Sequence, residues 1–198
     1  MKQKIQIRCK NNKKSQKVEI GSTLFDVFSS FDLKMTHGPV SARVNNKVEG
    51  MHYRVYNSKD VEFLDMTSAS GSRAYTRTLF FVLCKAVQDI YPNTDVVIDI
   101  PVSNGFYVDI RLGRPVVDED VNILRRRMQE IIDSKMPIRR FTVPTEEAIA
   151  LFQEKGDVEK VKLLKTSGSI YTTYYKIGEY VDYYYGTLLT NTSQLYLF

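Results

Sequence analysis

The stretch RAYTRTLFFVLCKAVQDIYP, residues 73–92, carries apolar side chains at helical spacing. The positions that recur every three or four residues are Leu79, Val82, Leu83, Ala86, Val87 and Ile90. This spacing puts them on one face of a helix, and Pro92 cannot continue it. We therefore predict a long helix whose apolar face is buried by the elements that follow.

The segment after this helix, DVVIDIPVSNGFYVDIRL (residues 95–112), has two alternating runs around Ser103-Asn104-Gly105. These three residues tolerate positive φ, so the segment predicts a β-hairpin. From Asp118 the pattern returns to helical, with Val121, Leu124, Met128, Ile131 and Ile132 inward. Three acidic residues, 118–120, lie where a helix N-terminus favours negative charge.

The remaining residues predict a mixture of short elements. PIRRFTVP (137–144) has a strand pattern, TEEAIALFQEKG (145–156) a helix that ends at Gly156, and DVEKVKLLK (157–165) another helix. SIYTTYYKIG (169–178), EYVDYYYG (179–186) and SQLYLF (193–198) are β-rich. Residues 73–198 are therefore expected to form an α+β domain with helices packed on an antiparallel sheet.

Residues 1–67 predict a second, smaller unit. KIQIRCK (4–10) and QKVEIGS (16–22) alternate around a turn, with Val18 and Ile20 inward, and Ser22 or Thr23 caps a helix. That helix buries Leu24, Val27, Phe28 and Phe31. Strands are expected in PVSARVNNKVEG (39–50) and VEFLDMTSAS (61–70). A hairpin, a crossing helix and returning strands make a ubiquitin-like β-grasp arrangement, joined to the second domain by a linker at 68–72.

Composition places the chain among compact proteins without a membrane span. Of its 198 residues 43% are hydrophobic, which is enough for a core. No apolar run approaches the ~20 residues that cross a bilayer, and the start lacks the apolar stretch of a signal peptide. Cys9 and Cys84 make no disulfide framework. We expect a reduced, cytoplasmic protein.

The net charge of +5 is unevenly distributed. The first 17 residues hold seven cations and no acid, among them Lys10, Lys13 and Lys14 in the predicted hairpin. These lysines could contact RNA phosphates, or only protect an edge strand from pairing with other chains. Arg125, Arg126 and Arg127 are expected on the outer, solvated face of their helix, with phosphate contact as the alternative.

The order and spelling of these segments resemble a known pair of domains. The first ~67 residues resemble a TGS domain, and the rest resembles the second additional domain of threonyl- and alanyl-tRNA synthetases. The resemblance is carried by AVQDIYP (86–92), VSNGFYVDIRL (102–112), MPIRRFTVPTEEAIALFQEKG (136–156) and GEYVDYYYG (178–186). It implies an editing-like fold over residues 73–198, and in those synthetases this domain removes a wrong amino acid from tRNA.

The family's catalytic pattern is missing. It places His-x-x-x-His on the first helix and Cys-x-x-x-His after YVD. Here these positions hold Arg77, Phe81, Tyr184 and Leu188. Phe and Leu cannot bind a metal or move a proton, and Arg is a poor general base. We therefore expect no catalytic residue, no metal and no cofactor, and no enzymatic activity from this chain alone.

A second resemblance concerns the context of the chain. A β-grasp module followed by a degenerate editing-like domain is similar to the front half of bacterial nucleoside kinases of the uridine kinase and phosphoribulokinase type. The chain has no G-x-x-x-x-G-K-[ST], so a C-terminal kinase domain is expected as its partner in a longer protein. The leading hypothesis is a non-catalytic accessory or regulatory region of a uridine kinase-like protein that binds nucleotide or RNA. The alternatives are a tRNA-editing deacylase domain of a threonyl-tRNA synthetase-like protein and a purely structural docking module.

The remaining candidates define a possible ligand groove. Its predicted residues are Arg77, Tyr107, Asp182 and Tyr184. The tyrosines at 174, 175 and 183–185 either stack on a base or fill the space left by the lost ligands, and strand alternation prevents them all from facing one pocket. Cys84 is expected to be a core residue rather than a nucleophile. His37 and His52 are expected to be ordinary loop residues.

Overall fold

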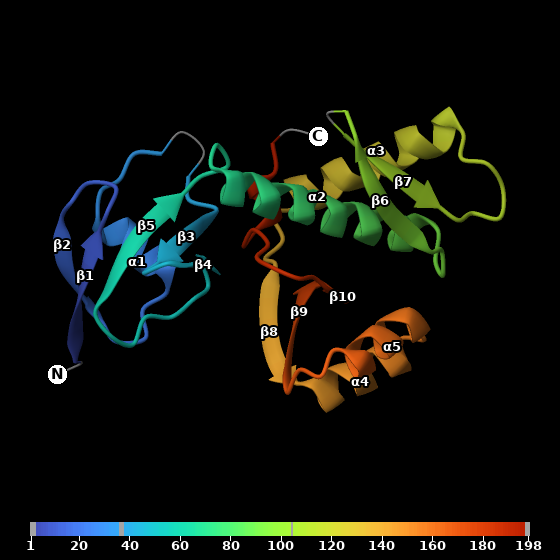
Figure 1. The fold of residues 1–198 in the computed structure, drawn as a ribbon. Helices are drawn as coiled ribbons and strands as arrows, with labels where there is room; N and C mark the ends of the chain where they lie inside the picture. Colours follow the sequence, from blue (N-terminus) through green and yellow to red (C-terminus); the bar gives the residue numbers. More distant parts are fainter. Residues whose placement is uncertain (1–2, 36–37, 104, 197–198) are drawn as a thin grey trace.

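The computed structural model describes residues 3–35, 38–103 and 105–196, so His37 and the turn residue Asn104 lie outside the described residues. The fold is α+β, as predicted. Figure 1 shows a small sheet with one helix at the N-terminal end, and a long helix, α2, that leads from it into the larger remainder.

The N-terminal module is a five-stranded sheet with one crossing helix. Its elements are β1 (Lys4–Cys9), β2 (Ser15–Glu19), α1 (Leu24–Ser30), β3 (Ser41–Val44), β4 (Lys47–Gly50) and β5 (Lys59–Leu64). The strand order is β2-β1-β5-β3-β4, and β1 runs parallel to β5. Thr23 caps α1 by accepting from the backbone N–H of Asp26 at 3.2 Å. The β-grasp arrangement is thus present, with Leu24, Val27 and Ile7 in its core.

Two predictions for this part of the chain are wrong. Ile20 is 36% exposed because β2 ends at Glu19 and the chain turns there. Residues 68–72 are no linker: Ser68 is the N-cap of α2 (Ala69–Ile90), and its hydroxyl accepts from the N–H of Gly71 at 3.1 Å. Gly71 packs so closely on Asp65 that a Cβ would lie 1.8 Å from that carbonyl oxygen. The chain therefore enters α2 without a flexible segment.

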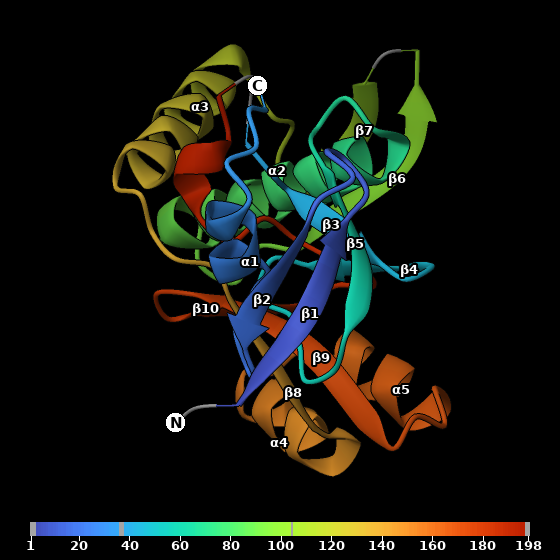
Figure 2. The same ribbon diagram turned by 90° about the vertical axis from the view of Figure 1, so that its left-hand side faces the viewer.

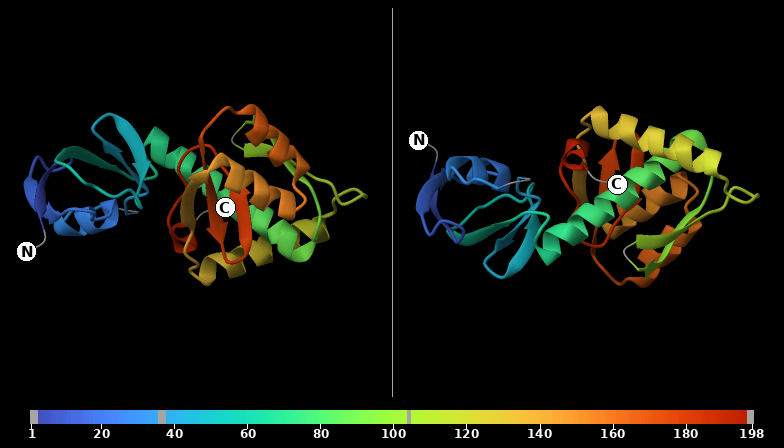
Figure 3. Two further views of the ribbon diagram at one scale, coloured as in Figure 1. Left: turned by 90° about the horizontal axis from the view of Figure 1, so that it is seen from below. Right: turned by 90° about the horizontal axis from the view of Figure 1, so that it is seen from above.

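Helix α2 organises the second module. The hairpin β6 (Val96–Val102) and β7 (Gly105–Ile110) and the helix α3 (Asp118–Asp133) both pack against it (Figure 3). Its core holds the predicted Val82, Ala86 and Val87, together with Phe81, and α3 adds Leu124, Met128, Ile131 and Ile132. Val121, predicted inward, is 47% exposed because it lies in the first turn of α3, outside this contact.

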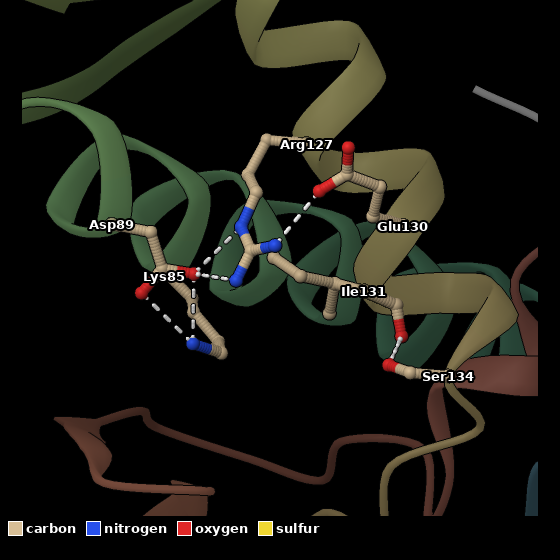
Figure 4. Close-up of polar contacts among 6 residues, drawn as sticks. All are labelled: Lys85, Asp89, Arg127, Glu130, Ile131 and Ser134. Carbon is tan, nitrogen blue, oxygen red and sulfur yellow. Dashed lines mark hydrogen bonds and ion pairs between the residues drawn. The ribbon is translucent and has the colours of Figure 1, made fainter.

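A polar contact fixes α3 to α2 (Figure 4). Asp89 on α2 accepts from Arg127 at 2.9 and 3.0 Å and from Lys85 at 2.9 Å. Arg127 also donates to Glu130 at 2.8 Å. The prediction that residues 125–127 are all simply solvated is therefore wrong for Arg127, which points back across the helix interface.

The rest of the chain builds a three-stranded antiparallel sheet with two helices on one face. Its elements are β8 (Arg139–Pro144), α4 (Thr145–Glu154), α5 (Val158–Thr166), β9 (Tyr171–Ile177) and β10 (Tyr180–Tyr183), in the order β10-β9-β8. Phe152 and Leu164 from α4 and α5 pack on Tyr174 and Val181 of the sheet. The other face turns toward α2. The strand predicted from Ser193 is not formed: Ser193 and Gln194 belong to a short 3-10 helix, Thr192–Gln194, and Leu195 is its C-cap. The Gln194 side chain accepts from the backbone N–H groups of Thr190 and Asn191 and holds this turn.

Figure 2 looks onto the N-terminal module, with the second module behind it. Contacts between the modules come from β4 and from the segments that flank β3 and β4. A ring nitrogen of His52 lies 2.9 Å from the carbonyl oxygen of Ile138, and Gln194 donates to the carbonyl of Pro39 at 3.4 Å. Gly50 packs on Thr187, which a Cβ at residue 50 would meet at 3.6 Å. His52 is therefore a contact between modules and not an ordinary loop residue.

Candidate functional site

The four positions that depart from the synthetase pattern lie together. Arg77 and Phe81 are one turn apart on α2, and Tyr184 and Leu188 follow β10. The ring of Phe81 is fully buried, with its centroid 5.7 Å from that of Tyr184 and 5.2 Å from that of Tyr180. Leu188 is 2% exposed in the same cluster. Apolar packing therefore surrounds Phe81, Tyr184 and Leu188, three of the positions at which the resemblance predicts the family's ligands.

Arg77 has a structural neighbour that explains the glycine beside the tyrosines. Its guanidinium lies against Gly186, where a Cβ would come 2.7 Å from a terminal nitrogen. Gly186 also has φ of 103°, which a larger residue rarely adopts. Its carbonyl accepts from the Tyr175 hydroxyl at 2.8 Å. Arg77 is thus packed beneath the turn after β10 rather than extended into solvent.

A buried polar centre lies next to this cluster. Asp182, 6% exposed, accepts from the Tyr180 hydroxyl at 2.8 Å and from the N–H of Tyr183 at 2.7 Å. The ammonium of Lys160 on α5 lies 2.9 Å from Asp182 and 2.6 Å from Asp157. Burial opposes the charge on Lys160, but the carboxylates of Asp182 and Asp157 outweigh it and raise its pKa. Lys160 therefore stays protonated at neutral pH.

Lys160 is the residue that sequence reasoning missed. Asp182 was named for the groove without a partner, and nothing in the alternation of β10 says which cation meets it. The local signal was Asp157 three residues before Lys160, which favours a pair at the start of a helix. That signal indicates Lys160 and Asp157 but not the contact with a strand.

The reactive side chains of this region are held in their neutral forms. Burial, with the nearby Asp182 carboxylate, raises the pKa of the Cys84 thiol to about 11. The same two causes, with Cys84 as a further neighbour, raise the pKa of the Tyr180 and Tyr184 hydroxyls well above their usual range. Neither a thiolate nor a phenolate is available at neutral pH, so none of the three is an effective base or nucleophile.

A cavity of about 600 Å³ opens beside this centre. Its wall includes Cys84, Arg111, Lys160, Tyr180 and Asp182. The wall offers hydrogen-bond donors, acceptors and charge, which suit a polar ligand. Within the described ranges no group of three or more His, Cys, Asp and Glu is arranged to hold a metal ion.

The other predicted groove residues lie elsewhere. Tyr107 is 58% exposed on β7 and does not line this cavity. Lys10, Lys13 and Lys14 are exposed on the β1–β2 hairpin of the other module. The structure thus gathers Arg77, Tyr184 and Asp182 around Phe81 and Cys84, and leaves the other four apart.

In the part of the chain that the structure describes, no helix has the length and apolar character that a membrane crossing requires.

Comparison with known proteins gives one consistent result. No protein-family model matches the chain. It is 29% identical over 179 residues, 90% of its length, to a threonine-tRNA ligase of Acetivibrio thermocellus. A threonine-tRNA ligase of Clostridium kluyveri is 29% identical over 96% of the chain, and one of Clostridioides difficile is 28% identical over 87%. The chain spans 27 to 30% of the length of these relatives.

Proposed function

We propose that this chain is a threonyl-tRNA synthetase-like accessory region that binds RNA and does not hydrolyse aminoacyl-tRNA. The similarity to threonine-tRNA ligases over about 90% of the chain supports a domain of that type. It favours the synthetase-like alternative over a uridine kinase context, because the relatives reported above are threonine-tRNA ligases. A TGS identity for the first module, the domain boundaries at 67 and 73, a following kinase domain and a cytoplasmic location stay predictions.

The observation that carries the proposal is the burial of Phe81 against Tyr184 and Leu188. A hydrolytic site needs a group that activates water at neutral pH. At the four family positions the chain has an aromatic ring, an aliphatic side chain, a guanidinium and a phenol with a raised pKa. Phe81, Tyr184 and Leu188 therefore contribute to packing rather than to proton transfer.

RNA binding is proposed for the exposed basic hairpin. Lys10, Lys13 and Lys14 are exposed side by side on the β1–β2 turn. Such lysines attract phosphates without base specificity, and each contact adds close to one unit to the salt dependence of the affinity.

The test is an assay of both properties on one preparation. Mischarged threonine-specific tRNA should lose its amino acid no faster with the chain than in buffer. The same tRNA should bind with a salt-dependent affinity, and replacing the three hairpin lysines by alanine should reduce the slope of log K against log salt by about 2 to 3.

Arg125→Ala with Arg126→Ala is the matched control, because both side chains are exposed on α3. This control should change the slope less. Deacylation above buffer that Lys160→Met abolishes would overturn the non-hydrolytic part of the proposal. Failure to bind tRNA at low salt would overturn the RNA-binding part.

A further inference from the structure

A groove of about 400 Å³ lies between the two modules, next to the Phe81 cluster, since Tyr184 belongs to both. One wall is the β4 strand with Lys47, Val48 and Glu49. The opposite wall is formed by Arg140 on β8, by residues 171–173 on β9 and by residues 183–187 after β10. Residues far apart in the sequence thus share one concave surface.

The groove exists because α2 covers only part of the sheet beneath it. On the face that turns toward α2, Tyr175 is 2% exposed and contacts Phe81. Tyr171 and Thr173 follow on the same face, since strand side chains alternate, and they line the groove. Tyr171 is 65% exposed. The start of β9 is therefore left open, and Leu164 of α5 with Ser167 and Ser169 after it also lines the groove.

The groove offers aromatic rings that are free to stack. Tyr185, after β10, is 86% exposed, and Tyr171, the first residue of β9, is 65% exposed. Both line the groove. Ser167, Ser169 and Thr173 also line the groove. Rings of this kind stack on nucleobases of any identity.

The groove also holds a buried acceptor. The Glu49 side chain is 9% exposed, with one carboxylate oxygen 3.0 Å from the Lys47 ammonium. Its second oxygen lies 4.0 Å from the Arg140 guanidinium. A carboxylate oxygen that lines a groove can accept a hydrogen bond from a ligand that donates N–H groups. Arg140 and Lys47 supply positive charge on either side of it.

We propose that this groove binds an unpaired nucleotide whose base carries an exocyclic amino group. Tyr185 stacks on the base, Glu49 accepts from the amino group, and Arg140 with Lys47 contacts the phosphate. The amino group of cytosine is a donor that carboxylates accept from, whereas uracil presents carbonyl oxygens there. The groove therefore discriminates cytosine from uracil. This inference rests on the RNA binding of the proposed function and names its base-reading site.

The experiment compares two RNA probes of equal length and charge, oligocytidylate and oligouridylate of six nucleotides, by fluorescence anisotropy with the intact chain. Equal charge cancels the contribution of the hairpin lysines. Oligocytidylate should bind about tenfold more tightly than oligouridylate. Glu49→Gln should remove that preference, and Tyr185→Ala should weaken both probes by about tenfold.

Tyr107→Ala is the control, because Tyr107 is an exposed tyrosine outside the groove, and it should change neither affinity. Cytidine monophosphate as competitor separates the two possible ligands. If it displaces the oligonucleotide at concentrations near the Kd of that oligonucleotide, the ligand of the groove is a free nucleotide. If only oligonucleotides displace the probe, the ligand is an RNA strand.

Each result bears on a different statement. If tRNA and both probes bind, but Tyr185→Ala and Glu49→Gln have no effect, the groove is overturned and the proposed RNA binding stands. If the probes bind equally, the base preference is overturned. If neither probe nor tRNA binds, the proposed function fails and this site with it. A melting temperature for each variant within about 2 °C of the parent shows that binding, not folding, has changed.

Discussion

One face of the β10-β9-β8 sheet is covered by α2 in one part and open to solvent in another. Where α2 crosses this face, Phe81, Tyr175 and Leu188 close the surface. Phe81 is fully buried, and Tyr175 and Leu188 are each 2% exposed. Where α2 ends its contact, β4 of the other module stands across an open groove, and Tyr171 and Tyr185 are 65% and 86% exposed. The same residue type is therefore a packing element in one half and an accessible surface in the other.

The difference teaches that the tyrosine-rich strands have no single role. Before the fold is known, stacking and core filling compete as explanations of the whole cluster. In the fold, Tyr175 lies in the closed half, and Tyr171 and Tyr185 lie in the open half. Tyr184 lies at the boundary, where it contacts Phe81 and also lines the groove. A function that needs an exposed aromatic ring must therefore use Tyr171 or Tyr185, whereas stability depends on Tyr175.

The largest expected effect is in the closed half. Phe81→Ala should lower the free energy of unfolding by about 3–5 kcal/mol, since it removes a fully buried ring that contacts three tyrosines. Phe106→Ala, a half-exposed ring with one aromatic neighbour, should cost about 1 kcal/mol. Urea denaturation measures both. Phe106 lies on β7, outside the β10-β9-β8 sheet, so equal costs would contradict the burial of Phe81 in the closed half.

The next effect is chemical. In a Cys9→Ala chain, Cys84 is the remaining thiol. With its pKa raised to about 11, the thiolate fraction at pH 8 is lower than in the unfolded chain by roughly a hundredfold. Because the thiol must lose a proton to react, alkylation of the folded chain should accelerate as pH rises toward 11. Rapid alkylation at pH 8 in the native state would show that the region beside Phe81 is open.

The polar centre should matter less than the ring. Lys160→Met removes the ammonium and leaves Asp182 with Tyr180 and a backbone donor, so the expected loss is about 2 kcal/mol. Lys162→Met, at an exposed position of the same helix, is the control and should lie within about 0.5 kcal/mol of the parent. In Lys160→Met, a second change of Asp182→Asn should recover part of the loss, because the unpaired charge is gone; a further additive loss would argue against the ion pair.

Most of the fold follows from local patterns. The 3.6-residue period of α2, the alternation of β1 and β2 and the cap at Thr23 are all visible in the sequence and present in the structure. The errors occur where a local pattern had two meanings. Ser68 and Gly71 have the composition of a linker, yet one caps α2 and the other allows its close approach to Asp65.

The site was less predictable because its parts meet through tertiary contacts. Arg77, Phe81, Tyr184 and Leu188 were located only through the resemblance to a known family. The pairing of Lys160 with Asp182, and of Glu49 with Arg140 across the modules, joins separate elements. No periodicity within one element encodes which cation an edge strand or a neighbouring module will meet.

The smallest effect gives the sharpest comparison, because it changes one atom at each of two tyrosines. Tyr175→Phe deletes a hydroxyl that donates to the Gly186 carbonyl at 2.8 Å from a 2% exposed residue. It should cost about 1 kcal/mol, the usual net value of such a hydrogen bond. Tyr185→Phe deletes a hydroxyl on an 86% exposed side chain and should change stability by less than about 0.5 kcal/mol. Urea denaturation of both variants measures the two costs, provided that the slope of unfolding free energy against urea concentration is the same for both. A cost at Tyr185 equal to that at Tyr175 would mean that the open half is also packed, and the groove between the modules would then lose its accessible ring.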